Sequence, residues 1–189
     1  LLKLCRAQGL SSPEVISVAV SGPLDRLKGV VMEPEDLPTW VDAQLKGRLV
    51  VRYNLPVFIE HRSRAAALAE WYYGAGAGTE NMVLVDLEPV VSIGAVLMGQ
   101  VYRGSQDAAG AIDKQPAALD GAHGSGILND WVSGRGMARL AAERFPQRWA
   151  VPPDPYQLVQ AVINGDSDAV SIVGDASRVL AQALNWVAA

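Results

Sequence analysis

Residues 55–78, LPVFIEHRSRAAALAEWYYGAGAG, join a short apolar run, a charged junction and an alanine-rich segment. The run at residues 57–60 predicts a buried strand, and residues 63–73 predict a helix because neither Gly nor Pro interrupts them. The glycines at residues 74–78 follow that helix and precede another apolar run. This is the position of a helix C-cap and linker, whereas nucleotide-binding glycine loops follow a strand and open a helix. A strand that runs directly into a helix through a charged junction is typical of the functional edge of an α/β protein.

The flanking sequence extends this α/β pattern in both directions. Short β-branched or apolar runs predict further strands at residues 15–21, 30–32, 81–87, 91–98 and 101–103. Helical spacing predicts helices at residues 41–53, 127–133, 137–144, 155–164 and 168–188. Residues 104–126 are rich in small residues and are expected to form an irregular loop. The Asp-Pro-Tyr-Gln sequence at 154–157 predicts a helix that begins with Asp154 as its N-cap.

The composition indicates a globular protein and excludes several functional classes. Half of the 189 residues are apolar and 19% are charged, so the chain can bury a sizeable core. The net charge is −4 and no Lys/Arg block occurs, so any DNA contact is expected from a segment elsewhere. The longest nearly uninterrupted apolar run, residues 90–98, is about half of a membrane span. The single cysteine, Cys5, excludes an internal disulfide framework and favours a cytoplasmic location. His61 and His123 are the only histidines, and neither a metal nor a cofactor is expected.

Three ordered segments carry a resemblance to a known family. Residues 18–40, VAVSGPLDRLKGVVMEPEDLPTW, contain a strand, a Gly-Pro turn and a Leu-Pro segment that ends in Trp. Residues 55–78 combine Leu-Pro-Val with the alanine-rich helix and a Gly-Ala-Gly series. Residues 94–112, GAVLMGQVYRGSQDAAGAI, contain a Gly-x-x-Leu-x-Gly-x-x-Tyr-Arg-Gly hairpin. In this order and spacing, the segments resemble the ROK family of sugar kinases and sugar-responsive repressors.

The resemblance implies an α/β chain with an actin-like ATPase fold, related to ribonuclease H, in two lobes. Residues 1–75 would form the remainder of the N-terminal lobe with the start of the crossover helix. Residues 76–189 would form the first part of the C-terminal lobe, a β-meander followed by helices. Both ends are expected to be incomplete, because family members begin with a further hairpin and continue past the last helix into another strand.

The residues at the family's catalytic positions differ in this sequence. In the family, the Asp of a Glu-Asn-Asp motif removes the proton of a sugar hydroxyl. This position is Arg62, whose guanidinium stays protonated and cannot act as a base. The preceding sugar-binding Asn corresponds to His61, and a later Asn of the motif corresponds to Arg64. The family's glycine-rich phosphate loop falls on Glu88-Pro89-Val90-Val91-Ser92, where a carboxylate and a proline replace N–H donors.

The metal and sugar positions implied by the resemblance have changed as well. The zinc cysteines fall on Asp120, Ala122 and Ile127, and the sugar-contacting Glu falls on Ala111, so no metal site is expected. The groups that now stand at the sugar positions, and are the candidate ligand-binding residues, are Asp36, His61, Arg62, Lys114 and Asn129. Arg62 and Lys114 are certain cations and His61 is a possible one. Together they suggest an anionic ligand such as a sugar acid or sugar phosphate. An equally open alternative is that Asp36 or Glu60 neutralises Arg62 in a closed cleft without ligand.

These changes lead to three functional hypotheses. The first is the effector-binding and dimerisation domain of a ROK-type transcriptional regulator that has lost sugar kinase activity and has no catalytic residues. Its ligand would change the relative orientation of two lobes in a homodimer whose DNA-binding module lies outside this chain. The second hypothesis is an active sugar kinase, and the third is a pseudokinase scaffold that binds no ligand. The first is favoured because base, phosphate loop, metal site and sugar contacts are altered together.

Overall fold

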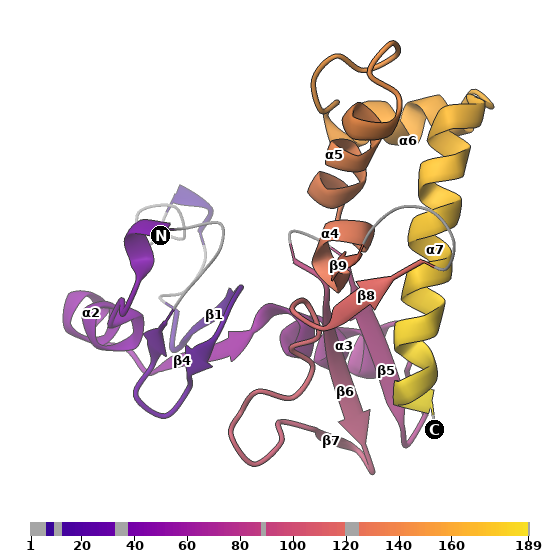
Figure 1. The fold of residues 1–189 in the computed structure, drawn as a ribbon. Coiled ribbons are helices and arrows are strands. Elements are labelled where there is room, and N and C mark those ends of the chain that lie inside the picture. Colours follow the sequence, from indigo (N-terminus) through magenta and orange to yellow (C-terminus); the bar gives the residue numbers. More distant parts are fainter. Residues whose placement is uncertain (1–6, 10–12, 33–37, 88–89, 120–124, 189) are drawn as a thin grey trace. The chain divides into compact units, whose positions relative to one another are not determined.

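The computed structural model describes residues 7–9, 13–32, 38–87, 90–119 and 125–188. The chain forms two compact units, and each is described by itself below. Unit 1 contains residues 1–84 and 94–109, and unit 2 contains residues 85–93 and 110–189. Figure 1 shows the order of the helices and strands along the chain. The expected lobe boundary near residue 75 stays a prediction.

Unit 1 contains a two-stranded parallel sheet that leads into a helix. Strands β1 (Ile16–Val20) and β4 (Val57–His61) pair in parallel, and helix α3 (Arg62–Tyr73) begins directly after β4. In β4, buried and exposed residues alternate, so that Val57 and Ile59 face the core and Phe58 is exposed. The strands and the helix expected in this part of the sequence are confirmed to within one residue.

A small core lies beneath this sheet. It is formed by residues of β1 and β4 and by three further elements of unit 1, which are β2 (Leu24–Asp25), β3 (Val30–Val31) and α2 (Leu45–Tyr53). The buried members are Leu24, Val31, Val57 and Ile59, and the partly buried residues packed against them are Ile16, Val20, Leu45 and Leu49. This core fixes the end of β4, where the charged junction begins.

Helix α2 begins four residues later than the helical spacing predicts, so the expected helix over residues 41–53 is wrong at its start. After the short 3-10 helix η1 (Pro38–Trp40), Asp42 has a φ of 52°. Ala43 then exchanges two backbone hydrogen bonds with Val31, at 3.0 and 3.1 Å. A residue paired to a strand in this way cannot also supply the first turn of a helix. Asn54, with a φ of 51°, ends α2 in the left-handed conformation.

The expected β-meander is present. Strands β5 (Met82–Asp86), β6 (Ser92–Leu97) and β7 (Gln100–Val101) form a three-stranded sheet in that order. Met98 and Gly99, with φ values of 50° and 72°, make the two-residue turn between β6 and β7. The glycine series after α3 also has the expected role, because the N–H of Gly74 caps the helix by donating to the Glu70 carbonyl at 2.9 Å.

Within the described residues, unit 2 contains a short hairpin and four helices, together with the end of β5 and the start of β6. Strands β8 (Pro116–Ala118) and β9 (Ser125–Ile127) pair antiparallel, so the expectation of an irregular loop over residues 104–126 is wrong in part. The helices that follow are α4 (Leu128–Val132), α5 (Gly134–Arg144), α6 (Pro155–Ile163) and α7 (Ser167–Ala188). The N-cap expected at Asp154 is confirmed, and it forms a capping box in which the Asp154 and Gln157 side chains each accept a backbone N–H. Among the described residues, no helix has the length and apolar character needed to cross a bilayer.

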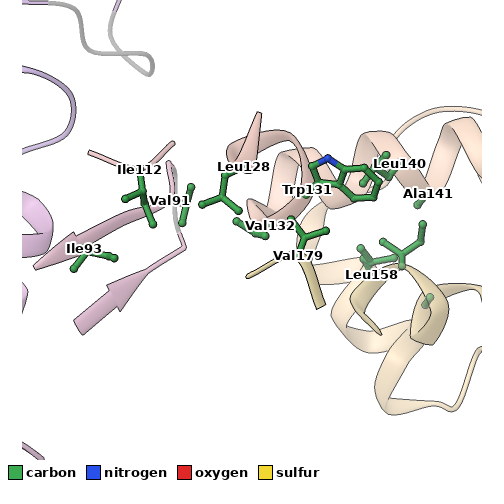
Figure 2. Packing of buried hydrophobic residues seen from close by; sticks show 12 residues of the cluster. Val91, Ile93, Ile112, Leu128, Trp131, Val132, Leu140, Ala141, Leu158 and Val179 are labelled. Atoms are coloured by element: carbon green, nitrogen blue, oxygen red, sulfur yellow. The ribbon is translucent and has the colours of Figure 1, made fainter. Parts of the chain in front are cut away.

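The core of unit 2 joins its helices to the residues that flank the start of β6. Leu128, Trp131 and Val132 of α4 pack with Leu140 of α5, Leu158 of α6 and Val179 of α7, as Figure 2 shows. Val91, Ile93 and Ile112 continue the same cluster. The helical part of unit 2 is therefore held by one continuous apolar cluster.

A substitution at Gly94 tests how closely β6 approaches α3 inside unit 1. A Cβ at this position would lie 2.1 Å from the Ser63 carbonyl oxygen and 2.7 Å from the Ala67 Cβ. We expect Gly94→Ala to lower the free energy of unfolding by about 2 kcal/mol, because helix backbone must move to admit the methyl group. Gly174→Ala is the matched control, since nothing lies within 4 Å of its added Cβ, and it should raise stability by up to about 1 kcal/mol. Equal changes in the free energy of unfolding for Gly94→Ala and Gly174→Ala, measured by denaturant unfolding, would contradict the close approach of β6 to α3.

Candidate functional site

The junction between β4 and α3 is the centre of the candidate site. His61 is the N-cap residue of α3 in an extended conformation, and Arg62 is the first residue of the helix. The His61 side chain makes no capping hydrogen bond to the backbone. Its Nδ1 lies 2.9 Å from the Oγ of Ser63, a side chain that is fully buried. The first turn of α3 contains no acidic residue, so its positive dipole end carries arginines instead.

Glu60, the residue before this junction, accepts four hydrogen bonds from three residues. Its Oε1 accepts from the Arg64 Nε at 2.8 Å and from the His61 backbone N–H at 2.9 Å. Its Oε2 accepts from both Nη2 and Nε of Arg103, at 2.7 and 3.1 Å. Glu60 therefore joins the start of α3 to the segment after β7 through charge-assisted hydrogen bonds.

Arg64 continues this network into the segment that follows Arg103. Its side chain is only 2% exposed, and its Nη1 donates to the Asp107 carbonyl oxygen at 2.9 Å. The Asp107 carboxylate lies 3.7 Å from Arg64 Nη2 and 3.6 Å from Arg26 Nε. Among the described residues, the buried Arg26 Nε and Asp107 Oδ2 share this ion pair without a hydrogen bond. We call Arg26, Glu60, Arg64, Arg103 and Asp107 the arginine network.

The arginine network keeps Glu60 ionised. Burial of the carboxyl group raises its pKa, but hydrogen bonds from Arg103, the His61 N–H and Arg64 outweigh burial, and the pKa of Glu60 is lower than its ordinary 4.5. The network contains three guanidinium groups and two carboxylates, so it has one positive charge in excess. Arg62 adds a further cation at the same end of α3.

The structure describes four of the five candidate ligand-binding residues. His61 and Arg62 are adjacent at the junction in unit 1. Lys114 and Asn129 belong to unit 2, where Lys114 is an exposed turn residue and Asn129 lies in α4. The backbone N–H of Asn129 donates to the carbonyl of Asp113, the neighbour of Lys114, at 3.0 Å. Asp36 lies outside the described residues, as do Cys5, Asp120 and His123.

Two backbone donors near the position of the implied phosphate loop are already engaged. Glu88 and Pro89 lie outside the described residues. The N–H of Val91 donates to Asn129 Oδ1 at 3.0 Å, and the N–H of Ile93 donates to the Gly110 carbonyl at 2.9 Å. The Val91 side chain is fully buried in the unit 2 core. These contacts give Asn129 a structural role in addition to its predicted ligand-binding one.

In the part of the chain that the structure describes, no group of three or more His, Cys, Asp or Glu side chains could hold a metal ion. The described site offers guanidinium and imidazole groups around the end of one strand. Such an arrangement suits the binding of carboxylate or phosphate oxygens.

Sequence comparison identifies the family to which these features belong. The sequence model of the ROK family matches residues 6–189. The chain belongs to the ROK family. A xylose repressor of Bacillus subtilis is 33% identical over 89 residues, which are 47% of this chain and 23% of the repressor. A glucokinase of Halalkalibacterium halodurans is 34% identical over 109 residues, 55% of this chain and 33% of the glucokinase. Regulators and kinases are thus both among the relatives of this ROK chain.

The fold of this ROK protein agrees with the resemblance. The crystal structure of a ROK hexokinase from Thermus thermophilus superposes with a TM-score of 0.74 at 29% identity, covering 97% of this chain. The expected mixed α/β, actin-like ATPase fold is therefore confirmed. The chain spans 62% of that hexokinase and smaller shares of the two relatives above.

The sequence pattern alone did not reveal the arginine network. The closeness in sequence of Glu60, in β4, and Arg64, in the first turn of α3, was a usable signal for part of it. Arg103 and Asp107 lie 43 residues from their respective partners Glu60 and Arg64, so nothing local in the sequence pairs them.

Glu60→Gln tests the arginine network. We expect it to lower the free energy of unfolding by about 3 kcal/mol at neutral pH, because the buried Arg64 loses its closest carboxylate. The pKa of Glu60 is lower in the folded state than its ordinary 4.5, so its stabilisation is complete above pH 4.5 and is lost as the pH falls through the folded-state value. The difference between variant and wild type should therefore be largest near neutral pH and disappear in acid, as measured by denaturant unfolding across a pH series.

Glu143→Gln is the matched control for this measurement. It removes an exposed carboxylate that lies 3.6 Å from Arg139 on α5, and such a pair contributes less than about 1 kcal/mol. A loss of stability in Glu60→Gln that stays the same from neutral to acid pH would contradict the ionic role of Glu60.

Proposed function

We propose that this chain is the effector-binding and dimerisation domain of a ROK-type transcriptional regulator without sugar kinase activity. The observation that carries the proposal is the position of Arg62. It is the first residue of α3, directly after β4, where the family resemblance places the carboxylate that acts as general base. A guanidinium remains protonated at physiological pH, so this side chain cannot accept the proton of a sugar hydroxyl.

The surroundings of Arg62 support this proposal. Glu60, the carboxylate next to the junction, is engaged by Arg64 and Arg103, and its pKa is lowered by them against the effect of burial. A base needs a pKa closer to the working pH, so Glu60 is a poor substitute. Near the implied phosphate loop, the N–H groups of Val91 and Ile93 already have acceptors within the protein. The similarity to the Bacillus subtilis xylose repressor fits a regulatory role.

The effector is proposed to be an anionic sugar derivative. Its carboxylate or phosphate oxygens would bind Arg62 and His61 at the positive end of α3. The excess positive charge of the arginine network favours an anion over a neutral sugar at this end of the helix. Binding would shift the relative orientation of the lobes in a homodimer, and a DNA-binding module outside this chain would respond to it.

A ligand screen tests the effector. Sugar acids and sugar phosphates should raise the melting temperature, because a ligand that binds only the folded state stabilises it by about 2.7 kcal/mol at a hundred times its Kd. Neutral sugars should have little effect. Arg62→Ala should abolish the shift, whereas Arg52→Ala, which removes an exposed arginine at the end of α2, should retain it. Stabilisation by neutral sugars alone would exclude an anionic effector, and a flat screen would favour the ligand-free scaffold.

A sugar kinase is the second candidate, because the chain is similar to a glucokinase and to the Thermus hexokinase. ATP turnover with a panel of hexoses separates the two candidates. The regulator proposal expects no phosphorylated sugar above the level of a protein-free control. Turnover that disappears in Arg62→Ala and persists in Arg52→Ala would overturn it.

A further inference from the structure

The segment after β7, residues 103–109 with the sequence RGSQDAA, forms a closed loop in unit 1. Its two ends meet, because the Ala109 N–H donates to the Arg103 carbonyl at 3.0 Å. The residue before it is held to β6, since the Tyr102 N–H donates to the Ala95 carbonyl at 2.8 Å. The loop therefore projects from a fixed base, and we call residues 103–109 the strap.

The strap is held closed by charged groups and not by apolar packing. None of its seven residues belongs to the apolar clusters of the described chain, and none of them is buried. Its described side-chain contacts with the rest of unit 1 are ionic. Arg103 donates two hydrogen bonds to Glu60, and the Asp107 carboxylate lies close to Arg64 and Arg26. Segments with few buried apolar contacts open locally at a lower free energy than the core around them.

The side chain of Asp107 is a weak point in these contacts. Asp107 Oδ2 and Arg26 Nε lie 3.6 Å apart, and both atoms are buried without a hydrogen bond to any described residue. Charges that lose water and gain no hydrogen bond recover little of the cost of burial. The φ of Asp107 is 58°, a left-handed conformation that is unfavourable for most residues with a Cβ. The Asp107 side chain therefore favours the closed position only weakly.

The closed strap covers a cation at the start of α3. Arg64 is the third residue of this helix, and its side chain is 2% exposed. Its Nη1 donates to the Asp107 carbonyl at 2.9 Å, and its Nη2 lies 3.7 Å from the Asp107 carboxylate. Its Nε is bound by Glu60 within the junction itself. Both terminal nitrogens of the guanidinium thus face the strap, and they would meet solvent if the strap moved away.

We propose that the strap opens as a local unit and that its position controls access to Arg64 at the start of α3. In the open state, the Arg64 guanidinium becomes a further cation two residues from Arg62. An anion that binds Arg64 would shift the population toward the open state, because a ligand favours the state to which it binds more tightly.

The use of the open strap by an anion rests on the proposed function, but the opening itself does not. The experiment below measures the opening in the protein without any ligand. A strap that stays closed therefore leaves the thermal-shift result intact, and a flat ligand screen leaves the opening intact.

Two rates measured on the wild-type protein test the opening. Trypsin can cleave after Arg103 only when this side chain leaves Glu60, so mass spectrometry of the fragment that ends at Arg103 reports the open strap. Phenylglyoxal, which modifies accessible guanidinium groups, should label Arg64 only when the strap has moved away. Both rates should depend on urea much more weakly than global unfolding does, because a local opening exposes little surface.

A matched pair of variants tests which group holds the strap. Asp107→Asn keeps the backbone carbonyl and the shape of the side chain but removes the charge that faces Arg64 and Arg26, and it should raise both rates about fivefold. Glu143→Gln removes an exposed carboxylate at the same 3.6 Å from an arginine in unit 2, and it should leave both rates unchanged.

Several results would overturn the proposal. The first is cleavage at Arg103, or labelling of Arg64, with the urea dependence of global unfolding, and this result requires no variant to fold. Cleavage at Arg103 without labelling of Arg64 would show that the strap does not cover this guanidinium. Rates that Asp107→Asn leaves unchanged, or that Glu143→Gln raises equally, would contradict the role of Asp107.

Discussion

The candidate site depends on the cost of burying the Arg64 guanidinium. An arginine with 2% exposure needs carboxylates and carbonyls around it, because a buried charge without partners is strongly destabilising. Glu60 supplies the closest carboxylate. Asp107 supplies its backbone carbonyl and a more distant carboxylate. These contacts fix the end of β4, the first turn of α3 and the segment after β7 relative to one another inside unit 1. The geometry around Arg62 follows from them, since Arg62 lies between Glu60 and Arg64 in the sequence.

This constraint also limits what Glu60 can do chemically. A carboxylate that accepts from Arg64, Arg103 and the His61 N–H is held in its ionised form and in one orientation. Such a group stabilises structure and keeps neighbouring cations in place, but it is a weak proton acceptor at neutral pH. The junction therefore combines a carboxylate whose two oxygens already accept hydrogen bonds with arginines that stay charged. It is better suited to holding an anion than to moving a proton.

Local patterns in the sequence predicted most of the elements of the fold, and non-local contacts account for the errors. The strand and helix around the junction follow from apolar alternation and helix propensity, and the start of α6 follows from its capping residues. The start of α2 was wrong because Ala43 pairs with Val31, and the β8–β9 hairpin was missed because its pairing depends on Ile127 opposite Pro116. The candidate residues His61 and Arg62 could be found from the family resemblance. The burial of Arg64 could not, since arginine is ordinarily exposed and one of its two partners, Asp107, lies 43 residues away in the sequence.

The helix dipole gives a physical reason to connect Arg62 with an anion. A cation at the N-terminal end of a helix is unfavourable by a few tenths to about 1 kcal/mol, and α3 has arginines at its first and third positions and no acidic residue in its first turn. Glu60 and Asp107 compensate the charge of Arg64. Arg62 stands at the same positive end, where an approaching carboxylate or phosphate would interact favourably with both the guanidinium and the helix end. A neutral sugar can accept hydrogen bonds from these groups but has no negative charge for them to attract, so the electrostatics of this helix end favour the anionic ligand class.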